Sequence, residues 1–167
     1  ATAKWIAFLD ADDEWYPNHL KYAKNIISDN EKVSFVFFNY DVLFNKQKRT
    51  IHKITDNKIL NKLDLLKFYS YQALMNTNSI LVKRDLLIDT GGFPEGKVKR
   101  GGDSDLWLRL MLKCNYAIWG HESTSCYHMD DSGVIKNPNT LGNKHLIYDT
   151  VNEYLNNKKI TSEDEKK

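Results

Sequence analysis

The sequence predicts an α/β domain, in which short apolar strands alternate with amphipathic helices and polar loops. Three observations support this prediction: apolar runs of strand length, apolar residues at helical spacing, and clusters of glycine or aspartate between these segments. The 167 residues include 41% hydrophobic and 12% aromatic residues, which is enough for a hydrophobic core. We expect one domain over residues 1–157, followed by a polar tail over residues 158–167.

The N-terminal part of the chain contains two predicted strands and one predicted helix. Residues 5–9 form an apolar run that ends at an acidic cluster, as expected of a strand buried on both faces. Pro17 stands where a helix can begin, and apolar residues at helical spacing follow it over 20–27. Residues 33–40 are rich in Val and Phe and predict a second strand. Residues 45–58 are polar and basic and predict a hairpin arm or surface loop.

The C-terminal part continues the alternation. Glycines 91 and 92 are placed to end a helix, and Asp103 or Ser104 is placed to cap the next one. Between them, residues 94–102 carry three glycines and three basic residues and predict a mobile loop. The remaining elements are helices over 60–68, 84–88, 105–111 and 144–155, and strands over 79–82, 116–119 and 124–128.

Composition excludes several classes of protein. The net charge of +2 comes from 24 basic and 22 acidic residues, without the clustered basic face of a nucleic-acid binder. No apolar run approaches the roughly 20 residues of a membrane span, and no secretory signal is visible. Cys114 and Cys126 are too few for a disulfide framework and wrongly spaced for a zinc knuckle, which favours two reduced thiols in a cytosolic protein.

The acidic cluster Asp10-Ala11-Asp12-Asp13 directly follows the first predicted strand. Ligands of open α/β sheets gather at the carboxyl ends of strands, and several buried carboxylates need a positive partner. Mg²⁺ or Mn²⁺ would suit these oxygen ligands and would also bind a diphosphate. The alternative is a solvated acidic turn that caps the following helix, and spacing alone leaves both open.

Two other acidic motifs fit less well. An EF-hand loop requires glycine at its sixth position, where this chain has Trp15. An aspartyl-nucleophile phosphatase would carry Thr or Val two places after the second aspartate, where this chain has Glu14. A phosphoryl-transfer hydrolase is therefore a distant alternative.

A second candidate site spans Gly101 to Arg109, where glycines lead into a helix that begins with aspartates. Asp103 could stand at the mouth of a site. Taken alone, however, the segment favours a simpler interpretation, in which Asp103 caps the helix and Asp105 pairs with Arg109 one turn later.

Together, the two motifs resemble glycosyltransferase family two, inverting enzymes with the GT-A fold. The resemblance covers roughly residues 4–130. It rests on the Leu-Asp-x-Asp-Asp motif and the following Pro and Leu (Leu9 to Leu20), on Gly91-Gly92-Phe93, and on the counterpart of the Gly-Glu-Asp motif at Gly101 to Arg109. It implies a GT-A-like mixed sheet flanked by helices, here lacking the N-terminal nucleotide-binding strands.

The resemblance also implies roles for individual residues. Asp10 would face the nucleoside, Asp12 would bind the metal that bridges the diphosphate, and Asp13 would touch metal or sugar. Asp103 would be the catalytic base. His128 stands where some relatives have a metal- or phosphate-contacting histidine, although a lone histidine is more often structural.

Three basic residues and one substitution complete the comparison. Lys97, Lys99 and Arg100 could close over the diphosphate as a lid, or form a solvated basic loop. Gly102 replaces the glutamate of the family motif, which usually helps to hold the acceptor, and Asp105 is a candidate to compensate.

The implied function is transfer of a sugar, with inversion, from a UDP- or GDP-linked donor to a glycan or glycolipid acceptor, using Mn²⁺ or Mg²⁺. Richness in Lys, Asn and Ile favours a bacterial source. For a bacterial member of this family we expect a product in surface polysaccharide or lipooligosaccharide synthesis, made at the inner face of the membrane. The chain begins at Ala1 without methionine, so we expect a fragment with an exposed sheet edge that favours self-association. The alternative is a catalytically inert, truncated or degenerate GT-A module that acts as a scaffold.

Overall fold

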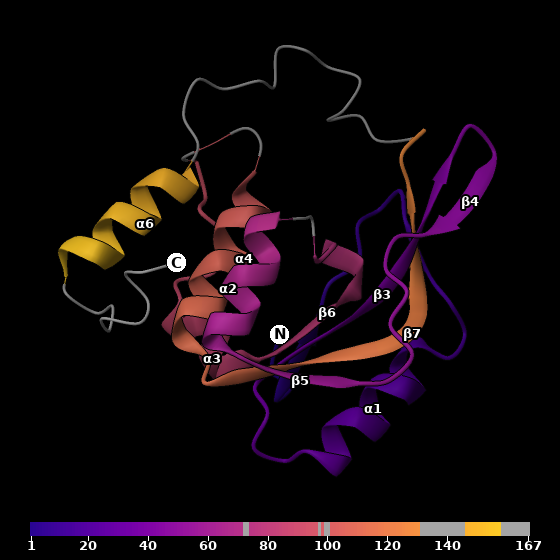
Figure 1. The fold of residues 1–167 in the computed structure, drawn as a ribbon, viewed down its shortest axis with the longest axis horizontal. Helices are drawn as coiled ribbons and strands as arrows, with labels where there is room; N and C mark the ends of the chain where they lie inside the picture. Colours follow the sequence, from indigo (N-terminus) through magenta and orange to yellow (C-terminus); the bar gives the residue numbers. More distant parts are fainter. Residues whose placement is uncertain (72–73, 97, 99–100, 131–145, 158–167) are drawn as a thin grey trace.

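A computed structural model of the chain shows a mixed seven-stranded sheet with helices on both faces (Figure 1). The structure describes residues 1–71, 74–96, 98, 101–130 and 146–157. Lys97, Lys99 and Arg100 of the predicted lid lie outside the described residues, as does the polar tail. The α/β class predicted from the alternation of apolar runs is confirmed.

The elements follow one another along the chain as strands interrupted by helices. The strands are β1 (Trp5–Ala7), β2 (Glu14–Trp15), β3 (Phe35–Phe44), β4 (Gln47–Thr50), β5 (Lys58–Asn61), β6 (Ile80–Lys83) and β7 (Tyr116–His128). The helices are α1 (His19–Asp29), α2 (Lys62–Tyr71), the 3₁₀ turn η1 (Thr77–Ser79), α3 (Arg84–Asp89), α4 (Gly102–Lys113) and α6 (Leu146–Asn156).

The long strands β3 and β7 run parallel to each other at the centre of the sheet. The strand order is β1-β6-β3-β7-β2, while β4 pairs with β3 and β5 pairs with β7. Every pairing other than that of β3 with β7 is antiparallel. The hairpin of β3 and β4 confirms the arm predicted within residues 45–58.

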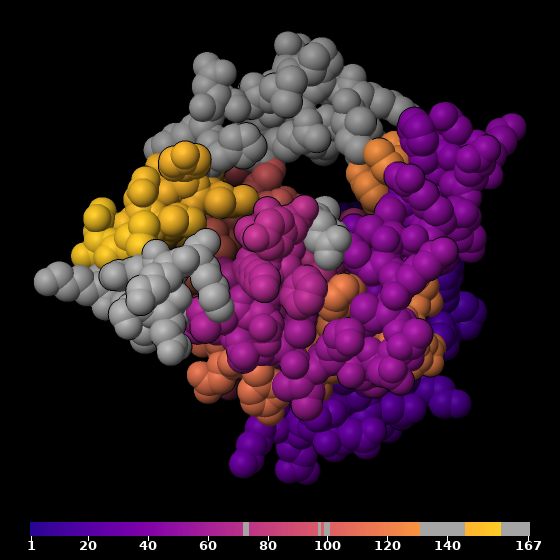
Figure 2. Space-filling view, viewed as in Figure 1, coloured from indigo at the N-terminus to yellow at the C-terminus, as the bar shows by residue number. Residues whose placement is uncertain are grey.

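Each face of the sheet has its own hydrophobic core, because successive side chains of a strand point to opposite faces. Phe35 and Phe37 of β3 belong to the core shared with α2 and α4. Val36 and Phe38, the alternate residues, belong to the core shared with α1. Helix α6 packs against α4, and the space-filling view shows α6 in yellow at one side of the molecule (Figure 2).

Three predicted boundaries are wrong. The strands predicted over 116–119 and 124–128 form the single strand β7, because the polar residues between them keep pairing with β3 across two register shifts. Helix α4 begins at Gly102, and its N-cap is Gly101 at φ 77° without a side-chain hydrogen bond, so neither Asp103 nor Ser104 is the cap. Leu60 lies in β5, so the helix predicted over 60–68 begins later, at Lys62.

The first strand also differs from its prediction. Residues Trp5–Ala7 are only partly buried, and Leu9 is 47% exposed. Among the described residues, β1 pairs only with β6, so it is an edge strand rather than one covered on both faces. No helix of the described part of the chain is long and apolar enough to cross a membrane.

Candidate active site

The acidic loop that follows β1 is held in place by contacts with distant parts of the chain. The N–H of Asp13 donates to the carbonyl of Asp10 at 3.2 Å, which closes the loop into a turn. One carboxylate oxygen of Asp13 accepts the backbone N–H of His128 at 2.8 Å. The other accepts the side-chain amide of Asn78. Asp13 is thus fixed by residues from the end of β7 and from η1, which directly precedes β6.

Asn78, which is absent from the residues predicted to form the site, organises the acidic loop. Its side chain is fully buried, and its Oδ1 accepts the N–H of Asp10 at 2.7 Å. Its carbonyl accepts the indole N–H of Trp15 at 2.8 Å. Asn76 Oδ1 in turn accepts the Asn78 amide nitrogen at 2.8 Å, which fixes the orientation of that side chain.

The position of Asn78 follows from strand register. Ala7, the last residue of β1, pairs with Leu81 in the antiparallel β1–β6 ladder. The same register, continued three residues past this pair, brings Asp10 opposite Asn78. The signal in the sequence is the polar run Asn76-Thr77-Asn78-Ser79 directly before an apolar strand. That run reveals nothing of its partner until the pairing of β1 with β6 is known.

Like charges are concentrated at the acidic loop. Partial burial, followed by the charges of Asp13, Asp12 and Asp103, raises the pKa of Asp10. Burial also raises the pKa of Asp13, with the charge of Asp12 adding to it, while the hydrogen bonds from His128 and Asn78 oppose the rise. A divalent cation would relieve this repulsion, and oxygen-rich sites of this kind suit Mg²⁺ or Mn²⁺.

Asp103 reaches this cluster from the other half of the chain. It lies in the first turn of α4, where the positive end of the helix dipole stabilises a carboxylate. The structure therefore brings together the predicted residues Asp10, Asp12, Asp13 and Asp103, although about ninety positions separate the last from the others.

Three aromatic rings join the segments that carry these carboxylates. Phe8, beside the acidic loop, packs edge-on to Phe93 of the Gly-Gly-Phe element at 5.7 Å between ring centroids. It also packs edge-on to Trp107 of α4 at 5.4 Å, and Phe93 meets Trp107 at 5.9 Å. Since Trp107 is buried in the core, the trio fixes α4 against the acidic loop.

The side chain of Asp105 is buried and binds other residues of the protein. Its side chain is 4% exposed and pairs with Arg109 at 2.9 Å, and it also accepts the hydroxyl of Thr150. Arg109 donates further to the carbonyls of Thr90 and Gly92, which ties the Gly-Gly-Phe element to α4. The carboxylate of Asp105 is therefore occupied in holding these segments together.

Gly102, which replaces the glutamate of the family motif, lies close to the preceding loop. A Cβ at this position would lie 3.1 Å from Cγ of Pro94 and 3.5 Å from Cγ2 of Val98. Any side chain here would require the loop at Pro94 to move by a few tenths of an ångström.

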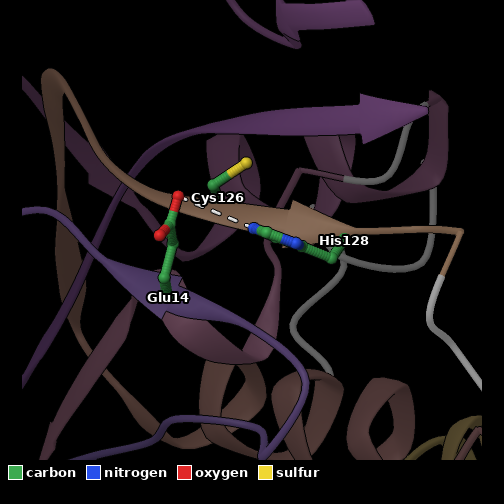
Figure 3. Close-up of side chains that lie close together, drawn as sticks. All are labelled: Glu14, Cys126 and His128. Atoms are coloured by element: carbon green, nitrogen blue, oxygen red, sulfur yellow. Dashed lines mark ion pairs between the residues drawn. The ribbon is translucent and has the colours of Figure 1, made fainter. Parts of the chain in front are cut away.

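His128 takes part in two sets of contacts at the end of β7. Its backbone N–H binds Asp13, whereas its ring Nε2 lies 3.6 Å from a carboxylate oxygen of Glu14 (Figure 3). Glu14, Cys126 and His128 each offer a ligand atom, and these atoms lie within 4.8 Å of one another. Within the described part of the chain, this is the one such group of three.

Comparison with known proteins places the chain in a family. The model of glycosyl transferase family 2 matches residues 1–89. The chain belongs to this family. The resemblance to this family is thereby confirmed, and the acidic motif on which it partly rests lies within the matched residues.

The curated relatives that the chain matches are glycosyltransferases. Uncharacterized glycosyltransferases of Rickettsia typhi and Rickettsia prowazekii are each 27% identical over 122 residues, 71% of this chain. The chain spans 37% of the length of each of these relatives.

The crystal structure of S. aureus TarS 1-349 in complex with UDP-GlcNAc has a TM-score of 0.69, with 15% identity, over 90% of this chain and 41% of that one. Without ligand, TarS 1-349 has a TM-score of 0.60 over 77% of this chain and 36% of that one, at 17% identity. This structural likeness confirms the GT-A-type fold.

Proposed function

We propose that this chain carries the metal-binding and acceptor-activating positions of an inverting glycosyltransferase with a nucleotide-diphosphate sugar donor. The observation that carries the proposal is that the charges of Asp12, Asp13 and Asp103 all act on Asp10. Repulsion among these carboxylates favours a ligand that carries positive charge. Membership of glycosyl transferase family 2 supports the same conclusion.

In this proposal the acidic loop holds Mn²⁺ or Mg²⁺ and the donor. Asp12 and Asp13 would bind the ion, with Asp10 toward the nucleoside and His128 as a further ligand from β7. The ion, when bound, would offset the charge that develops on the departing nucleoside diphosphate. Asn78 would keep Asp10 and Asp13 at a fixed separation, since it binds both.

Asp103 would act on the acceptor. Its carboxylate would take the proton of the acceptor hydroxyl while that oxygen attacks the anomeric carbon of the donor. The bond to the diphosphate breaks on the opposite face of the sugar, so the anomeric configuration inverts. The contacts of Arg109 with Asp105 and Gly92 would position the helix that presents Asp103.

The donor and the product are proposed more broadly. Similarity to TarS, solved with UDP-GlcNAc, favours a UDP-linked over a GDP-linked sugar. A glycan or glycolipid acceptor, surface polysaccharide or lipooligosaccharide as product, and synthesis at the cytoplasmic side of the membrane complete the proposal. Lys97 and Arg100 remain proposed lid residues that would contact the diphosphate.

Calorimetric titration of UDP into the chain, with and without Mn²⁺, tests this proposal. We expect heat of binding only with Mn²⁺, and its loss in Asp12→Asn. Asp29→Asn, which removes an exposed carboxylate at the end of α1, is the matched control and should bind as the parent does. Absence of Mn²⁺-dependent binding in the parent, or equal binding by Asp12→Asn, would overturn the assignment and leave the scaffold alternative.

A further inference from the structure

A second group of potential ligands lies beside the acidic loop, on strands β2 and β7. Glu14 of β2 stands directly opposite Cys126 of β7 in the antiparallel register. His128 is two residues beyond Cys126, so both side chains leave the same face of β7. Strand pairing alone therefore places a carboxylate, a thiol and an imidazole together, and Figure 3 shows the three side chains converging.

The chemistry of this group differs from that of the acidic loop. The loop offers carboxylate oxygens, which suit Mg²⁺ and Mn²⁺, whereas a thiolate with an imidazole favours borderline-soft ions such as Zn²⁺. Three protein ligands with one position left for water are typical of zinc sites that remain open to exchange. The mixture of ligand types thus selects a different class of ion from the one proposed for the donor.

The geometry permits a tetrahedral ion. The ligand atoms of Glu14, Cys126 and His128 lie within 4.8 Å of one another, and a tetrahedral Zn²⁺ would draw them to about 3.5 Å apart. The side chain of Glu14 is 54% exposed, so it can rotate toward the ion from the solvent side. Cys126 is 1% exposed, which keeps its sulfur under the strands and fixes the inner end of the site.

We propose that Glu14, Cys126 and His128 bind a divalent cation of the Zn²⁺ class at a site beside the acidic loop. On binding, Cys126 releases its thiol proton to solvent as the sulfur–metal bond forms, and water completes the coordination. The proposal does not depend on sugar transfer. Since the ring of His128 is shared with the proposed donor site, zinc would compete with Mn²⁺ for that ligand.

Cobalt provides the test, because Co²⁺ occupies zinc sites and gives a thiolate-to-metal charge-transfer absorption. Co²⁺ is titrated into the reduced chain without nucleotide, and Zn²⁺ is then added. The proposal expects the absorption to appear with the parent, to be bleached by Zn²⁺, and to be absent from Cys126→Ser. Cys114→Ser removes the other buried thiol, whose sulfur donates to the carbonyl of Met111, and should leave the absorption unchanged.

Two more variants keep the test decisive. His128→Gln retains the thiol and should weaken Co²⁺ binding by at least about tenfold. This variant tests the proposed site if Cys126→Ser fails to fold. Asp12→Asn should bind Co²⁺ as the parent does, since Asp12 is not one of the three ligands of this site. No charge-transfer absorption in the parent, its persistence in folded Cys126→Ser, or unchanged affinity in His128→Gln would overturn the proposal.

Discussion

The backbone N–H of His128 donates to the carboxylate of Asp13 at 2.8 Å, across 115 positions of the chain. This bond joins the end of β7 to the acidic loop, which follows β1 near the other end of the chain. The loop therefore takes its final shape only when β7 is in place.

Replacing Asn78 with alanine should destabilise the protein by about 1–3 kcal/mol, because it leaves the partly buried N–H of Asp10 and one oxygen of Asp13 without their partner. Urea unfolding measures the change. Asn152→Ala, on an exposed face of α6, should change the free energy of unfolding by less than about 0.5 kcal/mol. Equal effects of the two variants would show that Asn78 is not needed to hold the loop.

Arg109→Met should cost about 3–5 kcal/mol, since it leaves the buried carboxylate of Asp105 without its cation. The double variant Asp105→Asn/Arg109→Met removes that isolated charge and should recover part of the loss. A double-mutant cycle in urea measures the coupling between the two side chains. Additive losses of stability would mean that the two side chains do not interact energetically.

Asp10→Asn should stabilise the protein at neutral pH while abolishing Mn²⁺-dependent UDP binding. The folded pKa of Asp10 is raised above its ordinary 3.8 by partial burial and neighbouring carboxylates, so ionisation of this group opposes folding. The protonated carboxyl of Asp10 favours the folded state, and this contribution is complete below pH 3.8 and is lost as pH rises through the folded pKa. The gain at pH 7 should therefore shrink as pH falls toward 4. A stability difference that does not depend on pH would contradict this origin.

Phe8→Ala should weaken UDP binding in the presence of Mn²⁺ by about tenfold or more, because the aromatic trio no longer fixes α4 against the acidic loop. The loss of packing should also cost about 2 kcal/mol of stability, less than for a fully buried ring. Phe44→Ala is the matched control, since Phe44 is 48% exposed at the end of β3. Equal UDP affinities of the two variants in calorimetry would show that the aromatic trio does not position the binding site.

The sequence predicts much of this site because its key groups lie in motifs whose neighbours along the chain define them. The acidic loop follows an apolar strand, and Asp103 follows a glycine pair, so both are visible as local patterns. Asn78 is different, since its importance comes from the register of β1 with β6, which joins residues 68 positions apart. No local pattern carries that information.

The wrong boundaries have similar physical causes. Residues 120–123 are too polar to predict a strand, yet pairing with β3 extends β7 through them, and Asn39 donates to the carbonyl of His121 at 2.6 Å near the register shift. The start of α4 is set by the left-handed backbone of Gly101 rather than by a side-chain cap. Asp103 is thereby left in the first turn of the helix instead of being used as its cap.

The central claim is that Asp12 and its neighbours bind a metal–diphosphate complex at the end of β1. The most direct measurement is NMR broadening of backbone amides by paramagnetic Mn²⁺ in the presence of UDP. The account predicts that the amides of residues 10–13, 78 and 103 broaden first, that those of α6 stay sharp, and that Asp12→Asn abolishes the pattern. Broadening centred elsewhere, or an identical pattern in Asp12→Asn, would contradict it.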